Sequence, residues 1–278
     1  PSEEDAFDMV RDLLDHLPLT CFDEAPEFAA PSDADVAEDE DLNSFMPDDT
    51  NAGYDMMDLL TQLGDDEDII EIQENFAPNM ITAFGRIDGK TVGFVANNPM
   101  HLAGCIDADA ADKGARFIRI CDAYNIPLVF VVDTPGYLPG VEQEKVGLIH
   151  RGAKFAFAVV EATVPKVSLI VRKAYGGAYA VMGSKNLTGD INLAWPTAQI
   201  AGKQLDAAET PEQREMTKKM FMDFYDETMT APYVAAERGY LDAMVQPSQS
   251  RLALRQALRQ LATKQESDLP KKRTIAPM

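Results

Sequence analysis

The sequence predicts an α/β protein with a largely parallel sheet, because buried strands and amphipathic helices alternate along most of the chain. Two continuous apolar runs, residues 127–132 and 166–171, are bounded by turn residues, as is typical of strands buried on both faces. A stripe of apolar side chains at helical spacing precedes each run, over residues 109–124 and 149–160. Short corners between such units favour parallel strands joined by right-handed crossovers.

Further elements extend this pattern at both ends of the body. Residues 81–86 and 91–96 are strand-like and flank Asp88-Gly89, a dipeptide that strongly indicates a tight hairpin. Apolar spacing also predicts late helices over residues 216–225 and 251–261. We therefore expect one α/β domain over residues 76–278.

The first 75 residues differ in composition from this domain. Residues 1–74 contain 25 of the 46 acidic residues and only one of the 25 basic residues, Arg11. Helical spacing predicts short helices over residues 4–16 and 56–63. Between them, residues 21–53 have too few large apolar groups to fold as an independent unit. We expect an acidic connector over residues 1–75, extended in its middle and suited to lying on a partner surface.

The charge of the whole chain excludes some classes of function. A net charge of −21 argues against nucleic-acid binding, which needs a basic face, and against an anionic membrane surface. No apolar run approaches the roughly 20 residues that cross a bilayer. The three cysteines show no C-x-x-C spacing, and the chain shows no secretory signal. A reducing cytoplasmic setting is the expectation.

The most informative motif is the glycine-rich corner after the second apolar run, Tyr175-Gly176-Gly177-Ala178-Tyr179. Its small residues leave the backbone bare, so N–H groups at the start of a helix could hold developing negative charge on an oxygen atom. Close packing of the helix start against a strand explains the same glycines equally well. A second corner, residues 133–140, should lie beside the first, because ligand sites of such sheets collect at the carboxyl ends of the strands.

The sequence contains few candidates for catalytic side chains. The motifs of serine hydrolases, zinc proteases and P-loop proteins do not occur, and no metal site is expected. His16, His101 and His150 are scattered and fit surface or packing roles. Asp133 and Glu142 could form an acid–base pair, or Asp133 could cap a turn. The candidates that remain are backbone donors, which suit enolates and similar oxyanions, with acyl-CoA thioesters as natural substrates.

Many separate motifs, in order from about residue 5 to the end, resemble the carboxyltransferase β subunit of biotin-dependent acyl-CoA carboxylases, of the propionyl-CoA and acetyl-CoA type. The motifs that carry this resemblance are Gly93-Phe-Val-Ala-Asn97, Gly104-Cys-Ile-Asp107, Lys113-Gly-Ala-Arg-Phe117, Cys121-Asp-Ala-Tyr-Asn-Ile-Pro-Leu128, Asp133-Thr-Pro-Gly-Tyr-Leu-Pro-Gly140, Gln143-Glu144, Arg151-Gly-Ala-Lys154, Glu161-Ala-Thr163, Arg172-Lys-Ala-Tyr-Gly-Gly-Ala-Tyr179, Ala194-Trp-Pro-Thr197 and Ala235-Ala-Glu-Arg-Gly239.

The resemblance implies a crotonase-like fold and two such domains that bind different groups. In that family an N-terminal domain binds acyl-CoA and a C-terminal domain receives carboxybiotin. This chain resembles the C-terminal, biotin-side domain with the connector before it. The implied site has the biotin oxygen held by the backbone N–H groups of Gly177 and Ala178, with Tyr175 and Gly176 also in contact with biotin. Biotin removes the α-proton of the thioester, so no protein side chain acts as the base.

The resemblance also implies partners: a biotin carboxylase with its biotin carboxyl carrier, acyl-CoA, and further copies of the chain, since the family forms hexamers. In a eukaryote it would place the protein in the mitochondrial matrix. Two other functions stay open, namely the carboxyltransferase of a malonyl- or methylmalonyl-CoA decarboxylase and a catalytically incomplete assembly fragment. A start at Pro1 favours a fragment of a longer protein.

The sequence departs from the family pattern at two places. Ala180 lies where the family varies its residue with acyl-chain preference, and propionyl-type enzymes commonly have Asp there. After Ala201, relatives continue with a glycine- and alanine-rich segment and a helix, whereas here Gly202-Lys-Gln-Leu205 follows at once. We expect that about 15 residues near the biotin side are deleted or were left out of the recorded chain.

Overall fold

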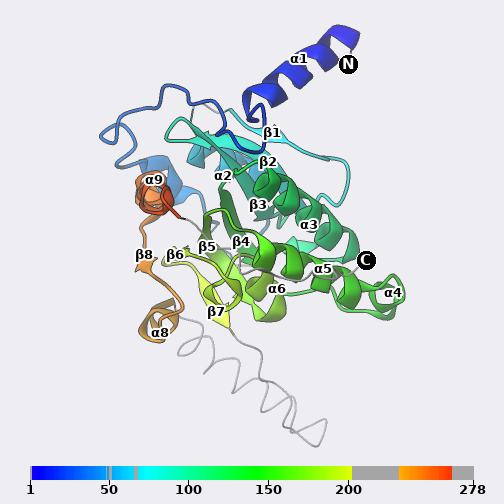
Figure 1. The fold of residues 1–278 in the computed structure, drawn as a ribbon. Coiled ribbons are helices and arrows are strands. Elements are labelled where there is room, and N and C mark those ends of the chain that lie inside the picture. Colours follow the sequence, from blue (N-terminus) through cyan, green and yellow to red (C-terminus); the bar gives the residue numbers. More distant parts are fainter. Residues whose placement is uncertain (1, 48, 50–51, 66–67, 202–231, 265–278) are drawn as a thin grey trace, which may run out of the picture.

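The computed structural model describes residues 2–47, 49, 52–65, 68–201 and 232–264, and these residues build one mixed sheet with helices on both faces (Figure 1). Eight strands occur in this part of the chain, in the order β1-β2-β3-β4-β5-β6-β8, and β7 pairs with the end of β5. The strands are β1 (Ile70–Glu71), β2 (Met80–Ile87), β3 (Lys90–Asn97), β4 (Leu128–Thr134), β5 (Lys166–Tyr175), β6 (Ile191–Ala194), β7 (Gln199–Ala201) and β8 (Ala243–Met244).

The four strands predicted from the sequence are all confirmed. β2 and β3 form the antiparallel hairpin, and Asp88 and Gly89 both adopt positive φ, +59° and +72°, as a two-residue type I′ turn requires. From β3 onward each neighbouring pair is parallel. The apolar runs become strands buried on both faces, because Phe130 faces one core and Val131 faces the other.

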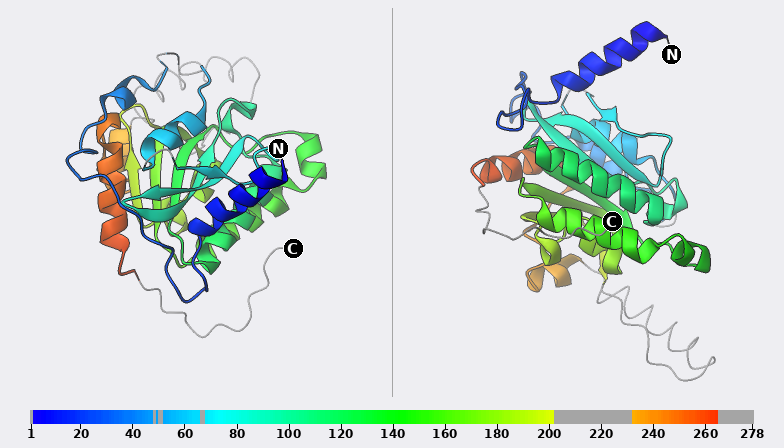
Figure 2. Two further views of the ribbon diagram at one scale, coloured as in Figure 1. Left: turned by 90° about the horizontal axis from the view of Figure 1, so that it is seen from above. Right: turned by 45° about the vertical axis from the view of Figure 1, so that its right-hand side comes forward.

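Helices cover both faces of the sheet (Figures 1 and 2). On one face α3 (Ala108–Ala123) and α5 (Leu148–Glu161) pack together and contribute Phe117 and Phe155 to a buried cluster. On the other face α2 (Met56–Leu63) and α9 (Ser250–Leu261) contribute Leu60 and Leu254. These four helices confirm the predictions within one or two residues. The connector therefore supplies α2, with Leu59, Leu60 and Leu63 fully buried, to the core.

The remaining short helices lie at the corners and at the N-terminal end. α1 (Glu3–Asp15) confirms the predicted first helix; it projects from the body and has no buried residue (Figure 2). The others are α4 (Val141–Lys145), α6 (Gly176–Val181), α8 (Pro232–Glu237) and the 3₁₀ turns at Glu40–Ser44, Leu102–Gly104, Lys185–Leu187 and Pro247–Gln249. The predicted helix at 216–225 lies outside the described residues, as does most of the segment after Ala201. None of the described helices is long and apolar enough to cross a membrane.

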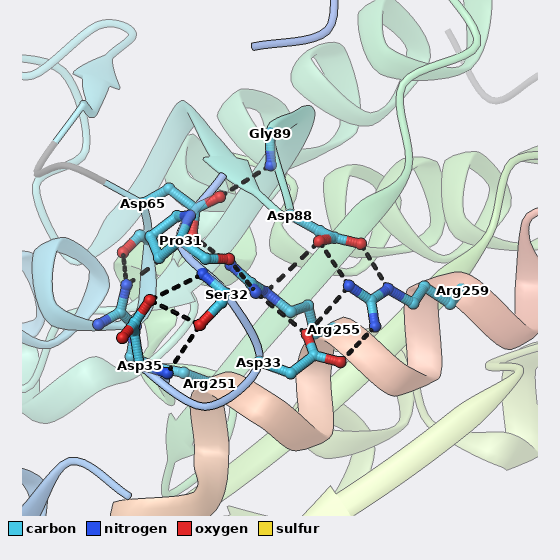
Figure 3. Close-up of polar contacts among 11 residues, drawn as sticks. Pro31, Ser32, Asp33, Asp35, Asp65, Asp88, Gly89, Arg251, Arg255 and Arg259 are labelled. Carbon is cyan, nitrogen blue, oxygen red and sulfur yellow. Dashed lines mark hydrogen bonds and ion pairs between the residues drawn. The ribbon is translucent and has the colours of Figure 1, made fainter. Parts of the chain in front are cut away.

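Parts of the extended connector lie on the body of the same chain. The Phe28 N–H donates to the Gly89 carbonyl at 2.9 Å, and the Asp39 N–H donates to the Ser248 carbonyl at 2.8 Å. An ionic cluster that we call the clamp reinforces these contacts (Figure 3). Its members are Asp33 of the connector, Asp65, Asp88 of the hairpin turn, and Arg255 and Arg259 of α9.

Candidate functional site

The two glycine-rich corners meet at one edge of the sheet. β4 and β5 are parallel neighbours, so the corner that follows Thr134 and the corner that follows Tyr175 emerge side by side. Tyr137 of the first corner reaches the second, because its ring lies 3.8 Å from where a Cβ atom on Gly177 would stand. Burial raises the pKa of the Tyr137 hydroxyl. The predicted adjacency of the corners is therefore present in the structure.

Gly176, Gly177 and Ala178 are the first three residues of α6, so their N–H groups have no acceptor within the helix. Gly176 has φ +59°, a conformation that favours glycine. An added Cβ at Gly176 would meet no described atom within 4 Å, and one at Gly177 would make only ordinary contact with Tyr137. Close packing therefore does not account for the two glycines. Backbone conformation accounts for Gly176, and the outer face of the turn is open.

The other residues predicted for this site have separate roles in the structure. The Tyr175 hydroxyl donates to the side-chain oxygen of Gln199, which ties the end of β5 to β7. Ala180 is half-buried, and its carbonyl accepts the Ser184 hydroxyl at 2.9 Å. Tyr179 is buried beside the turn, and this burial raises its pKa to about 12. Four of the predicted site residues, 175–178, thus form one continuous turn, and Ala180 lies one helical turn away from its start.

Asp133 does not pair with Glu142, so the suggested acid–base pair is wrong. Glu142 is exposed on α4 and binds Lys145 at 2.6 Å. The Asp133 carboxylate is buried and accepts hydrogen bonds from the Tyr54 hydroxyl at 2.8 Å, from Arg172 Nε at 2.9 Å and from the Lys173 N–H at 3.0 Å. With these donors around it, Asp133 is a structural acceptor rather than a free base.

Sequence reasoning missed this buried network because its members are far apart along the chain. Tyr54 lies 79 residues from Asp133, and Arg172 lies 39 residues from it. The only local signal was the polar Arg172 directly after a buried apolar run. Burial and the negative charge of Asp133 both raise the pKa of Tyr54, which therefore stays protonated and donates.

The histidines and cysteines outside this network do not form a catalytic cluster in the part of the chain that the structure describes. His101 and His150 are exposed, whereas His16 is buried with Nδ1 3.0 Å from the Asp12 carbonyl oxygen. Cys21, Cys105 and Cys121 are free thiols, and burial raises the pKa of Cys121. Within the described ranges, no group of three or more His, Cys, Asp or Glu residues could hold a metal ion.

The geometry suits stabilisation of an oxyanion by the backbone. The N–H groups of Gly176, Gly177 and Ala178 have no acceptor within α6, and of these residues Gly177 is exposed, Gly176 is half-buried and Ala178 is fully buried. Donors at such a turn can hold an oxygen on which negative charge develops. The neighbouring side chains, Tyr137 and Tyr179, are neutral at ordinary pH because burial raises their pKa. The site therefore offers donors for negative charge and no carboxylate aimed at the turn among its described neighbours.

Comparisons with known proteins identify the family. The model of the carboxyl transferase domain matches residues 1–275. The propionyl-CoA carboxylase beta chain of Saccharopolyspora erythraea is 48% identical over 99% of this chain and 54% of its own length. The methylmalonyl-CoA decarboxylase subunit alpha of Veillonella parvula is 44% identical over 100% of this chain and 54% of its own length.

A solved structure extends these similarities to the fold. Transcarboxylase 12S, a hexamer determined with methylmalonyl-CoA and methylmalonic acid bound, superposes with a TM-score of 0.90 at 39% identity. The match covers 97% of this chain and 53% of that one. The crotonase-like fold implied by the sequence resemblance is thus shown. The chain spans about half the length of the relatives that it matches.

Proposed function

The chain belongs to the carboxyl transferase domain family, and from this premise we propose that it is the biotin-side half of an acyl-CoA carboxyltransferase. In this proposal residues 76–278 form the domain that receives carboxybiotin, and residues 1–75 form the connector before it. One observation carries the proposal: a turn whose N–H groups, Gly176 to Ala178, have no acceptor within α6, and which is exposed at Gly177, lies at the carboxyl end of β5 beside the corner of β4. The other half of the enzyme would supply the CoA site.

The residues of the turn fit a biotin ureido group. Its carbonyl oxygen is a planar acceptor that two adjacent N–H groups can hold, and Gly177 and Ala178 are the donors that we assign to it. The open face at Gly176 leaves room for the ring, and the Tyr175 backbone leads directly into the turn. Carboxybiotin supplies CO2 at such a site when it is bound. Each backbone donor in an oxyanion site is worth on the order of 10²–10³ in rate.

The substrate and the partners follow from the family. We propose a short-chain acyl-CoA, propionyl-CoA or acetyl-CoA, as the acceptor of the carboxyl group, with the small side chain of Ala180 leaving space beside the pocket. A biotin carboxylase with its carrier domain would deliver carboxybiotin. We also propose assembly into a hexamer, as in the transcarboxylase 12S structure, and a cytoplasmic location, where carrier-bound biotin and acyl-CoA occur together.

A second candidate is transfer in the opposite direction. The similarity to the methylmalonyl-CoA decarboxylase subunit alpha of Veillonella parvula favours it, because an oxyanion turn serves transfer of a carboxyl group to biotin as well as from it. The partner distinguishes the two functions, since the carboxylase works with a biotin carboxylase and the decarboxylase works with a membrane decarboxylase. A fragment that only supports assembly would bind neither biotin nor CoA.

The proposal is tested by calorimetric titration of the chain with a biotinylated carrier peptide and, separately, with CoA. We expect the biotinylated peptide to bind and CoA to bind weakly. Gly177→Val places a branched side chain on the open face and should abolish binding of the peptide. Gly177→Ala adds one methyl group with ordinary contact to Tyr137 and should reduce binding less. Tight CoA binding without any response to the biotinylated peptide would refute the assignment.

A further inference from the structure

We infer that Tyr54 of the connector is a positioning residue for the Gly176–Ala178 turn, acting through Asp133 and Arg172. The turn itself belongs to the body of the fold, yet three side chains from the connector, β4 and β5 meet directly behind it. The role of Tyr54 in biotin binding rests on the proposed function, whereas its mechanical effect on the turn does not.

The regular pairing between β4 and β5 is interrupted near the carboxyl ends of the two strands. Val132 pairs with Ile170 and Thr134 pairs with Ala174, so β5 contains two more residues than β4 across this interval. Asp133 sits inside the break, and its Oδ1 accepts the Lys173 N–H at 3.0 Å. A side-chain carboxylate thus takes the place of a strand carbonyl, as happens at β-bulges that redirect a chain near active sites.

The position of this carboxylate determines where the last residues of β5 run. Residues 173–175 are held by Asp133 on one side and by pairing with β7 on the other. Gly176 follows at once, so residues 173–175 are held up to the first residue of the turn. A small movement of Asp133 would therefore reach the N–H groups of Gly177 and Ala178.

Arg172 and Tyr54 restrain the other oxygen of the same carboxylate. Arg172 Nε and Nη2 both lie 2.9 Å from Asp133 Oδ2, and Arg172 Nη1 donates to the Ala52 carbonyl at 2.8 Å. The Tyr54 hydroxyl donates to Oδ2 at 2.8 Å. Asp133 and Arg172 are 1% and 5% exposed, so these bonds are made away from water.

The ring of Tyr54 is held independently of its hydroxyl. The Arg172 guanidinium carbon lies 4.8 Å from the centre of this ring, and Phe45 packs against it edge-on with the centres 5.5 Å apart. Tyr54→Phe should therefore preserve packing and remove a single donor from Oδ2. This substitution isolates the link from the connector to the turn and should not prevent folding.

The experiment compares Tyr54→Phe with Tyr124→Phe in the 278-residue chain. Tyr124 ends α3, and its hydroxyl has no hydrogen-bond partner among the described residues, so the control makes the same chemical change without breaking a contact. Amide hydrogen exchange is measured at Lys173, whose N–H donates to Asp133, with Val131 and Leu169 in the centres of β4 and β5 as internal references. Amide chemical shifts are measured at Gly177 and Ala178. Titration with the biotinylated peptide is run on the same samples.

For Tyr54→Phe we expect about tenfold faster exchange at Lys173, altered amide chemical shifts at Gly177 and Ala178, and about tenfold weaker peptide binding, which corresponds to about 1.4 kcal/mol. The references and the Tyr124→Phe protein should stay unchanged. Unchanged chemical shifts at Gly177 and Ala178 would overturn the inference, and so would equal acceleration of exchange at Lys173 and at the references, because that indicates general destabilisation. If the original chain binds no biotinylated peptide, the proposed function fails while the exchange rates and chemical shifts still decide the role of Tyr54.

Discussion

Two of the attachments between the connector and the body differ in charge, and one of them includes an exposed ion pair. At the site, the Tyr54 hydroxyl and the Ala52 carbonyl meet Asp133 and Arg172, which are buried. At the clamp, the connector contributes Asp33, whose side chain is 49% exposed, to Arg259, whose side chain is 47% exposed (Figure 3). The attachment at the site uses neutral groups of the connector, whereas the clamp uses two of its acidic side chains, Asp33 and the buried Asp65.

This difference indicates that the acidity of the connector is not part of the chemistry of the turn. A carboxylate from the connector behind the turn would add negative charge where a developing oxyanion must be stabilised. The network instead contains one carboxylate, Asp133, and neutralises it with Arg172 at 2.9 Å. The Asp33–Arg259 pair of the clamp is about half exposed, so water and salt screen its charges. The two attachments should therefore respond differently to substitution and to ionic strength.

The largest effect is expected from Asp133→Ala. Removal of this carboxylate leaves the buried Arg172 cation without its partner and the Lys173 N–H without its acceptor. Breaking a buried ion pair in this way costs about 3–5 kcal/mol of unfolding free energy. Denaturant titration measures the loss. Glu142→Gln is the control, because it breaks an exposed pair with Lys145 and should change stability little. Equal losses in the two variants would contradict the distinction between buried and exposed pairs.

A smaller effect is expected from Arg259→Gln at the clamp. Arg259 makes bidentate contacts with Asp33 and with Asp88, all of them at the surface. The variant should unfold at a slightly lower temperature than the original chain at low salt, and the difference should shrink at about 0.5 M NaCl because exposed charges are screened. Peptide binding at the turn should not change. A loss that persists at high salt would show that the clamp acts like the buried attachment.

The sequence predicts the local elements of the molecule better than it predicts contacts between residues that are far apart along the chain. Strands, helices and the turn at Gly177 follow from local patterns, namely apolar runs, helical spacing and glycines at a strand end. The Asp133 network could not be predicted in this way, since Tyr54 and Asp133 are 79 positions apart along the chain and meet only in the folded structure. The sequence leaves Asp133 open as a member of an acid–base pair or as a turn cap, because its neighbours along the chain do not show which donors surround it in space.

The smallest effect is a dependence of stability on pH through His16, at a third contact between the N-terminal segment and the body. His16 is 1% exposed and lies against Phe84, with Nε2 3.7 Å from Asp68 and Arg86 nearby. Burial is the main cause that lowers the His16 pKa, with the Arg86 charge acting in the same direction. The neutral imidazole is therefore the form that the folded protein accommodates.

The sign of the pH effect follows from this direction. The unfolded chain binds a proton at His16 near pH 6.5, whereas the folded chain binds it only at lower pH. The contribution of His16 to the unfolding free energy is therefore complete above pH 6.5 and is lost as the pH falls toward the pKa of His16 in the folded chain. We expect the unfolding free energy to decrease between pH 7.5 and 5.5, and His16→Phe to flatten this decrease. His101→Phe, at an exposed position, serves as the control for the loss of a histidine. Greater stability at pH 5.5 than at pH 7.5, removed by His16→Phe, would show that the Asp68 carboxylate outweighs burial and that the imidazolium is the favoured form.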